Sequence, residues 1–101
     1  MIVVSHSDGC IKIKGHAGYA EAGKDIVCAA VSTLTQVFIA SVEELTRDNF
    51  ITCDISAGNV VIRYRNLSGR AKLLVDSFFV GIRMIADEYP DYVRIDRALM
   101  S

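Results

Sequence analysis

Apolar and polar residues follow two different periods along this chain, and the change between the periods marks out the secondary-structure elements. Five short stretches have the composition of β-strands, most of them with apolar residues at alternate positions; these are residues 2–7, 10–14, 50–56, 60–65 and 92–96. Two longer stretches, from Asp25 to about Thr46 and from about Arg70 to Tyr89, have apolar residues three and four apart, which is typical of helices with one buried face. The order ββαββαβ predicts an α+β fold, in which two helices pack against a mostly antiparallel sheet.

Glycine and proline residues divide these elements into two hairpins, each followed by a helix. Asp8-Gly9 suits a tight type I′ turn between the first two strands, because both central positions of that turn need positive φ. Gly15 ends the second strand, and residues 57–59, Ala-Gly-Asn, predict the turn of the second hairpin. Pro90 ends the second helix, because proline cannot continue a helical hydrogen-bond pattern.

The same spacings of apolar residues predict which side chains lie in the core. The first helix has its apolar stripe at Val27, Val31, Leu34, Phe38, Val42 and Leu45. The second helix has its stripe at Ala71, Leu74, Val75, Phe78, Ile82, Ile85 and Tyr89. Cys53 is expected in the core because it alternates with Ile51 and Ile55 in a predicted strand. Cys10, beside a turn, is expected to have at most a structural role.

Composition is that of a single globular domain. With 101 residues, we expect one domain over residues 1–101, large enough to bury a hydrophobic core. The hydrophobic share of 51% is slightly more than a monomer of this size hides, so we expect a homodimer. Eleven basic residues against twelve acidic ones give no electrostatic argument for binding nucleic acid or an anionic membrane.

The cysteines and the N-terminal residues indicate a cytoplasmic protein. Three cysteines without a CxxC pair argue against a disulfide framework or a structural zinc site, and reduced thiols are typical of the cytoplasm. Neither a metal nor another cofactor is expected. The first residues, MIVVSHSDG, have no signal-peptide pattern. The apolar segment from Ile26 to Leu45 is interrupted by polar side chains, so we expect a buried helix rather than a membrane span.

The stretch GHAGYAEAGKDIVCAAVS, residues 15–32, contains the candidate chemistry. If Asp25 is the N-cap of the first helix, Cys28 lies in the first helical turn, where the helix dipole favours a thiolate. His16 precedes Cys28 by twelve residues, enough chain for an imidazole at a strand end to fold back and activate the thiol. The N–H groups of Val27 and Cys28 are the expected oxyanion donors, because a first turn leaves them without partners inside the helix. We therefore hypothesise a cysteine-protease site.

Several residues of this stretch have a second interpretation. Asp25 either caps the helix or orients His16 as a third catalytic member, and we favour the cap. Ser32, one turn after Cys28, either hydrogen-bonds within the site or bonds back to a helix carbonyl. A cysteine near a helix start is more often a small apolar residue than a nucleophile. His6 is an alternative base, although nothing near it in the sequence supports that role.

Two other classes of function remain open at this point. Gly15-His-Ala-Gly18 matches GxxG, the loop with which KH domains clamp a nucleic-acid backbone, and would suit a small RNA- or ribosome-binding module. In KH domains that loop joins two helices, whereas here it follows a strand and no basic patch accompanies it. A metal site formed by His16, Cys28 and another cysteine has no support from the spacing.

The same stretch resembles the signature of the Prp (YsxB-like) family of ribosomal-processing cysteine proteases. That signature is GHA, a glycine-containing loop and then G-x-D-[IV]-V-C-A-[AS]-x-S; the matching residues here are Gly15, His16, Ala17, Gly23, Asp25, Val27, Cys28, Ala29 and Ser32. The resemblance implies a small α+β homodimer whose endopeptidase activity removes a short N-terminal extension from a large-subunit ribosomal protein, cutting after an aromatic-rich apolar stretch.

The resemblance also assigns roles to individual residues. It implies that His16 and Cys28 are the catalytic pair and that Asp25 and Ser32 support them. The loop between the pair is implied to be mobile and to order over the substrate, in agreement with glycines at Gly18 and Gly23. We expect this loop and the second helix to line an apolar groove for an extended peptide.

The chain departs from the family pattern in two places. Its first strand is short, and its second hairpin is reduced to a turn at residues 56–59, where many family members have a longer acidic, glycine-rich loop. Relatives also occur in phage-like settings, where a capsid protein can carry a similar cleavage sequence. The resemblance therefore leaves two substrates open, a ribosomal protein and a phage capsid protein.

Overall fold

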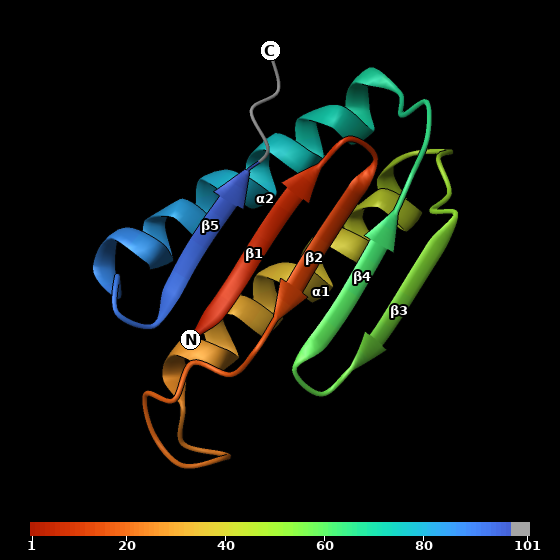
Figure 1. The fold of residues 1–101 in the computed structure, drawn as a ribbon. Coiled ribbons are helices and arrows are strands. Elements are labelled where there is room, and N and C mark those ends of the chain that lie inside the picture. The colour runs from red at the N-terminus through yellow and green to blue at the C-terminus, as the bar shows by residue number, and fades with distance from the viewer. Residues whose placement is uncertain (98–101) are drawn as a thin grey trace.

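The chain forms two hairpins, two helices and a final strand, arranged as one sheet with helices on one face. The computed structural model describes residues 1–97, so residues 98–101 of the predicted domain lie outside the described part. The elements are β1 (Ile2–Ser7), β2 (Cys10–Lys14), α1 (Ile26–Leu45), β3 (Thr52–Ser56), β4 (Asn59–Arg63), α2 (Gly69–Glu88) and β5 (Val93–Arg97) (Figure 1). This order confirms the predicted ββαββαβ arrangement and the α+β class.

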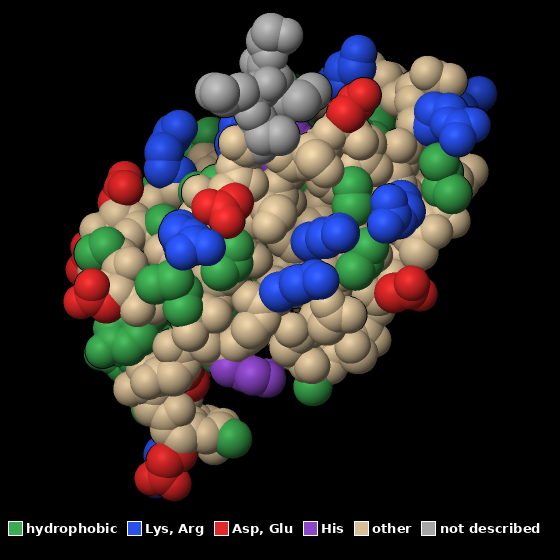
Figure 2. Space-filling model, viewed as in Figure 1, with side chains coloured by type: hydrophobic (Ala, Val, Ile, Leu, Met, Phe, Trp, Pro, Cys, Tyr) green, Lys and Arg blue, Asp and Glu red, His purple; other side chains and the backbone are tan. Residues whose placement is uncertain are grey.

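The sheet has the strand order β3-β4-β2-β1-β5 and is mixed. Neighbouring strands are antiparallel except β1 and β5, which run parallel. Both helices lie behind the sheet in Figure 1, so a single face is covered. The face toward the viewer in Figure 2 has basic side chains among apolar and acidic ones. The strand register places Lys12, Lys14, Arg63 and Arg94 on the face of the sheet opposite the core residues Ile11 and Ile13.

The turn between β1 and β2 differs from the predicted type. Gly9 has φ 72°, but Asp8 is not among the residues with positive φ, so the prediction of a type I′ turn is wrong. The turn is held from outside the hairpin instead, because the backbone N–H of Tyr64 donates to the Gly9 carbonyl at 3.0 Å. The hairpin register itself, with Ser7 opposite Cys10, is that of a two-residue connection.

Both helices begin and end near the predicted residues because their caps lie there. Asp25 caps α1, and the hydroxyl of Ser68 accepts from the Ala71 N–H at the start of α2. The two helices pack closely enough that a Cβ on Gly81 of α2 would lie 2.8 Å from Leu34 Cδ1 of α1. Leu45, predicted in the core, is 58% exposed because it follows Val42, the last buried residue of α1.

Helix α1 is long and apolar enough to span a membrane by length and composition alone. Core helices of globular domains pass the same test. Here its buried residues, Val27, Val31, Thr35, Phe38, Ile39 and Val42, face the other elements of the fold.

The prediction that Cys53 is a core residue is wrong. Cys53 lies opposite Ile62 and Ile55 lies opposite Val60, so both side chains are on the face that the helices cover elsewhere. Nevertheless Cys53 is exposed, and the exposed fractions of Ile51 and Ile55 are 59% and 62%. The reason is the strand order: β3 is an edge strand, and the two helices do not extend over it (Figure 1).

Candidate active site

The predicted histidine, cysteine and hairpin turn meet at one end of the sheet. His16 follows β2, Cys28 lies in the first turn of α1, and the β3–β4 turn reaches the same end (Figure 1). The Gly15 N–H donates to the Gly58 carbonyl at 2.9 Å, which joins the turn to the strand end. The His16 ring lies against Gly58 so closely that a Cβ there would be 2.6 Å from His16 Nε2. A glycine at position 58 therefore makes room for the imidazole.

Cys28 is half-buried and has a backbone donor directed at its sulfur. The N–H of Ala17, the residue after His16, donates to Cys28 Sγ at 3.3 Å. Ala17 itself is buried in the hydrophobic core, which fixes the position of this donor. A hydrogen bond to sulfur stabilises the thiolate over the thiol, because an ionised acceptor takes the stronger bond.

Asp25 uses both carboxylate oxygens on backbone N–H groups. Oδ1 accepts from Val27 and Cys28 at 3.0 and 2.9 Å, which confirms the predicted N-cap. Oδ2 accepts from Tyr19 and Ala20 at 3.0 and 3.3 Å. These bonds, with the one from Cys28 first, lower the pKa of the Asp25 carboxyl. Of the hydrogen bonds formed by residues 1–97, none joins Asp25 to His16.

The prediction that the Val27 and Cys28 N–H groups are free oxyanion donors is wrong. Both donate to Asp25 Oδ1, because an N-cap carboxylate takes the donors that a first turn leaves unpaired. Val27 also anchors the helix start in the core, where its side chain is fully buried. The donor near the sulfur comes instead from the strand end, through the Ala17 N–H. Sequence reasoning missed it because that contact depends on the path of the loop.

The loop between His16 and Asp25 is attached at two places. One is Asp25 Oδ2, which accepts from two loop N–H groups. The other is Tyr19, whose ring lies edge-on to those of Tyr89 and Tyr92 at centroid distances of 5.5 and 5.2 Å. Gly18 and Gly23 have φ 71° and 84°, so the path of the loop uses the freedom of both glycines.

Cys28, His16 and Ser32 border two hollows. The first, about 280 Å³, lies between α1 and the β3–β4 hairpin and includes Ile55 and Gly58. The second, about 670 Å³, lies under the loop. The loop therefore contributes to the groove as expected, but α1 and the hairpin form the rest. The prediction that α2 lines the groove is wrong, because the strand order places the β3–β4 hairpin beside β2 at this end.

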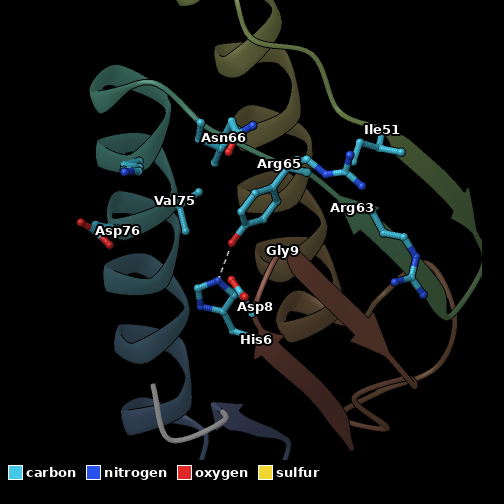
Figure 3. Close-up of a pocket in the computed structure, with 12 residues that line it drawn as sticks. His6, Asp8, Gly9, Ile51, Arg63, Arg65, Asn66, Val75 and Asp76 are labelled. Carbon is cyan, nitrogen blue, oxygen red and sulfur yellow. Dashed lines mark hydrogen bonds between the residues drawn. The ribbon is translucent and has the colours of Figure 1, made fainter. Parts of the chain in front are cut away.

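The other histidine, His6, lies near the β1–β2 turn, at the opposite end of β1, and is no candidate base for Cys28. Its Nε2 is 2.7 Å from the Tyr64 hydroxyl (Figure 3). Its Nδ1 is 3.1 Å from Arg97 Nη2. The ring stacks on Phe79 at a centroid distance of 4.7 Å. Burial first, and then the charge of Arg97, lowers the pKa of His6.

A hollow of about 820 Å³ surrounds His6, between the β1–β2 turn, the end of β4 and α2 (Figure 3). Sequence reasoning missed this hollow because its residues come from separate segments with no local motif. In the described chain, no three histidine, cysteine, aspartate or glutamate residues gather as a metal site would need.

A half-buried thiol at a helix start, with an imidazole bordering the same cleft, is the arrangement expected of a cysteine-dependent hydrolase. Comparison with known proteins gives the particular family. The model of the family Cysteine protease Prp matches residues 3–94, so this chain belongs to the Prp family of cysteine proteases. The family resemblance and the enzyme class expected from residues 15–32 are confirmed.

Relatives with known names agree with this assignment. Ribosomal processing cysteine protease Prp of Mycoplasma genitalium is 28% identical over 100 residues, which cover 95% of each chain. The Staphylococcus aureus (strain Mu50) protein of the same name is 30% identical over 84 residues, covering 81% of this chain and 79% of the relative.

Solved structures share the fold over nearly the whole chain. The S. aureus ribosomal processing protease Prp with a covalently linked product peptide has a TM-score of 0.87 and 27% identity, covering 97% of this chain and 100% of that one. SMU.848 from Streptococcus mutans has a TM-score of 0.73 and 28% identity, covering 95% and 90%.

Proposed function

We propose that this protease removes a short N-terminal extension from a large-subunit ribosomal protein, cutting after an aromatic or apolar stretch. The names of its relatives, ribosomal processing cysteine proteases, support this substrate class. The similar S. aureus structure with a covalently linked product peptide supports a peptide substrate and a covalent mechanism. A phage capsid protein with a similar cleavage sequence is the second substrate to be tested.

The proposed reaction uses His16 as base and Cys28 as nucleophile. His16 takes the thiol proton, and the thiolate attacks the scissile carbonyl carbon to give a tetrahedral oxyanion. The C–N bond breaks as the imidazolium gives its proton to the leaving amine, and a thioester on Cys28 remains. Water, deprotonated by His16, then hydrolyses the thioester and releases the new carboxyl terminus. The Ala17 N–H first stabilises the thiolate and then donates to the oxyanion next to the sulfur.

The observation that carries this proposal is the setting of Cys28 Sγ. The sulfur accepts the Ala17 N–H, and Cys28 borders two hollows that His16 also borders. An endopeptidase must hold chain on both sides of the bond that it cuts. A nucleophile that borders two hollows suits that requirement.

The proposal extends to assembly and location. Apolar side chains such as Val37 and Leu45 are exposed on α1, and covering them in a homodimer would remove that surface from water. We propose a cytoplasmic homodimer that needs no cofactor. Light scattering coupled to gel filtration tests this assembly, and a monomer at micromolar concentration would contradict it.

The test is a cleavage assay with two peptides, one with a phenylalanine-rich ribosomal-type extension and one with a capsid-type sequence. The wild type should cut the ribosomal peptide faster. Cys28→Ala and His16→Ala should lose about 10²-fold or more in kcat, the scale of positioned acid–base catalysis. Cys10→Ala should still cut, as the matched control for loss of a thiol.

Other outcomes separate the alternatives. Unimpaired cutting by Cys28→Ala would contradict the mechanism, and faster cutting of the capsid peptide would replace the substrate. Absence of cutting, with a salt-sensitive affinity for single-stranded RNA that is lost on changing Gly15 or Gly18, would favour the RNA-binding module.

A further inference from the structure

Three exposed residues of kinds that ordinarily belong in a core lie on β3 or directly before it. The register places Cys53 and Ile55 on the helix-facing side of β3, and Ile51, directly before the strand, continues their alternation along the chain; these three residues are here called the β3 stripe. Ile51 and Ile55 are more than half exposed, and Cys53 is exposed as well. Apolar residues gathered on a surface mark a binding site more often than isolated ones do.

The β3 stripe is continuous with the catalytic cleft. Ile55 and the adjoining Ser56 border the hollow that contains Cys28 and His16. Ile51 lies about 13 Å further along, four residues at the rise of a strand, and borders the hollow around His6 (Figure 3). A peptide that leaves the cleft in an extended form therefore passes along the whole stripe.

The outer edge of β3 is also open for hydrogen bonding. In the described sheet β3 pairs with β4 on one side and is the last strand on the other (Figure 1). Proteins usually protect such an edge with charges or proline, yet β3 carries a single charge, Asp54, and no proline. The other edge strand, β5, carries three charged residues, Arg94, Asp96 and Arg97. The contrast indicates that the edge of β3 is kept available for pairing.

We propose that the substrate adds to the open edge of β3 as an extended strand on one side of the scissile bond, with apolar side chains at alternate positions packing beside the β3 stripe. This inference rests on the proposed protease function and names the substrate class, extended peptides with alternating apolar residues. Main-chain pairing supplies affinity in this mode of recognition, and the side chains of every second residue supply the preference. The continuity of the stripe with the cleft favours substrate over a second copy of the chain.

The thiol of Cys53 is suited to contact with apolar substrate side chains along the β3 stripe. Partial burial against the sheet, followed by the charges of Glu43 and Asp54, raises the pKa of the Cys53 thiol although the residue is exposed overall. The thiol therefore stays protonated at neutral pH, and the middle of the stripe stays uncharged. An apolar substrate side chain can therefore pack against Cys53 without removing water from a charged thiolate.

The test compares serine variants of the stripe with a matched control. Ile55→Ser and Ile51→Ser should raise KM about fivefold or more for a peptide with alternating apolar residues, with kcat within twofold. Leu73→Ser is the control, because Leu73 is 68% exposed but lies on α2, away from the stripe. It should change neither parameter by more than twofold, and all three variants should keep the wild-type circular dichroism.

A second measurement tests the main-chain pairing. Peptides methylated on single backbone nitrogens are titrated against the Cys28→Ala variant, whose binding is read by fluorescence anisotropy without turnover. In the segment that pairs with β3, affinity should fall about tenfold at every second position and change little at the others.

The outcomes separate this inference from the proposed function. Equal KM in the wild type and both isoleucine variants, or uniform effects of methylation, would overturn the pairing on β3 while cleavage stands. If the isoleucine variants are monomers while the wild type is a dimer, and KM is unchanged, the β3 stripe would instead be a contact surface between two copies of the chain. A chain that neither binds nor cuts any peptide would overturn both proposals.

Discussion

Asp25 binds the helix start and the loop with one side chain. Its two oxygens accept from Cys28 and Val27 on one side and from Tyr19 and Ala20 on the other. The negative charge of the carboxylate offsets the positive end of the helix dipole close to Cys28. The donor that reaches the Cys28 sulfur directly is instead the Ala17 N–H.

Removing the Asp25 carboxylate should destabilise the protein and release the loop. Asp25→Ala should lower the unfolding temperature by more than Asp25→Asn, because the amide oxygen of asparagine still caps a helix. Amide exchange at Tyr19 and Ala20 should accelerate in both variants, which lose the charge-assisted bonds. Equal unfolding temperatures for the wild type and Asp25→Ala would contradict this role.

Acidification should remove the same stabilisation. The pKa of Asp25 is lowered from 3.8 in the folded protein, so its contribution to stability is present above that value and is lost as the pH falls toward the folded pKa. Unfolding midpoints of the wild type and Asp25→Ala, followed downward from pH 6, should therefore converge in acid. A constant difference between them would contradict the lowered pKa.

His6 is held neutral by its partners. Arg97 Nη2 can only donate, so His6 Nδ1 is the acceptor and Nε2 carries the proton donated to the Tyr64 hydroxyl. A second proton on His6 would break the bond from Arg97 and place two positive charges together. The lowered pKa of His6 has this cause in addition to burial, which comes first.

Stability should therefore depend on pH through His6. Because its folded pKa lies below the ordinary histidine value of 6.5, its contribution is fully present above pH 6.5 and is lost as the pH falls toward the folded pKa. Between pH 7.5 and 5.5 the wild type should lose more unfolding free energy than His6→Phe, which keeps a ring on Phe79 but does not titrate. A larger loss in the variant would contradict this assignment. Proton NMR titration gives the His6 pKa directly.

Among the elements, the β3–β4 hairpin lies against the imidazole of His16, the proposed base. Gly58 has φ 70° and leaves no room for a side chain beside His16. Gly58→Ala should displace the ring, and kcat/KM should fall about 100-fold, as for a misplacement of about 1 Å. The left-handed backbone should also cost about 1–2 kcal/mol of stability.

Gly23→Ala separates these two effects. Gly23 has φ 84°, yet a Cβ there meets nothing within 4 Å. Gly23→Ala should lose about as much unfolding free energy as Gly58→Ala, while its kcat/KM falls much less. A loss of kcat/KM in Gly23→Ala as large as that in Gly58→Ala would show that backbone strain, rather than contact with His16, controls activity.

Sequence patterns predicted elements well where the cause was local. Asp25 before an apolar period was sufficient to locate the start of α1. The lining of the cleft was not predictable in this way, because it depends on which hairpin lies beside β2. Strand order is set by the packing of the whole sheet, and no residue near Gly58 indicates that it meets His16.

At the scale of the molecule, the core between sheet and helices holds both ends of the sheet in place. Phe78 of α2 is 4% exposed and contacts Phe38 of α1, with ring centroids 5.2 Å apart. Phe78→Ala should lower the free energy of unfolding by about 3–5 kcal/mol, through lost burial and the remaining cavity. Leu73→Ala on the same helix should change it by about 0.5 kcal/mol or less. Urea denaturation measures both, and equal losses would contradict the assigned core.

Sequence patterns predicted which side chains lie on the helix-facing side of the sheet, but not how much of that side the two helices cover. Alternation correctly placed Cys53 on the same side as Ile51 and Ile55, but period alone does not say whether a helix lies above. The sheet is wider than the helix pair, so an edge strand with a core-like pattern ends up exposed. The hollow around His6 likewise forms from separate segments that only the complete fold brings together.

The most direct test of the catalytic pair is to trap the acyl-enzyme. Wild-type protein mixed with the ribosomal-type peptide and quenched in acid should show a thioester on Cys28 by mass spectrometry of its proteolytic fragments. In His16→Ala the same adduct should form about 10²-fold more slowly. Cleavage that proceeds with an adduct on Cys10 or Cys53, or at the wild-type rate in Cys28→Ala, would contradict the assignment of His16 and Cys28.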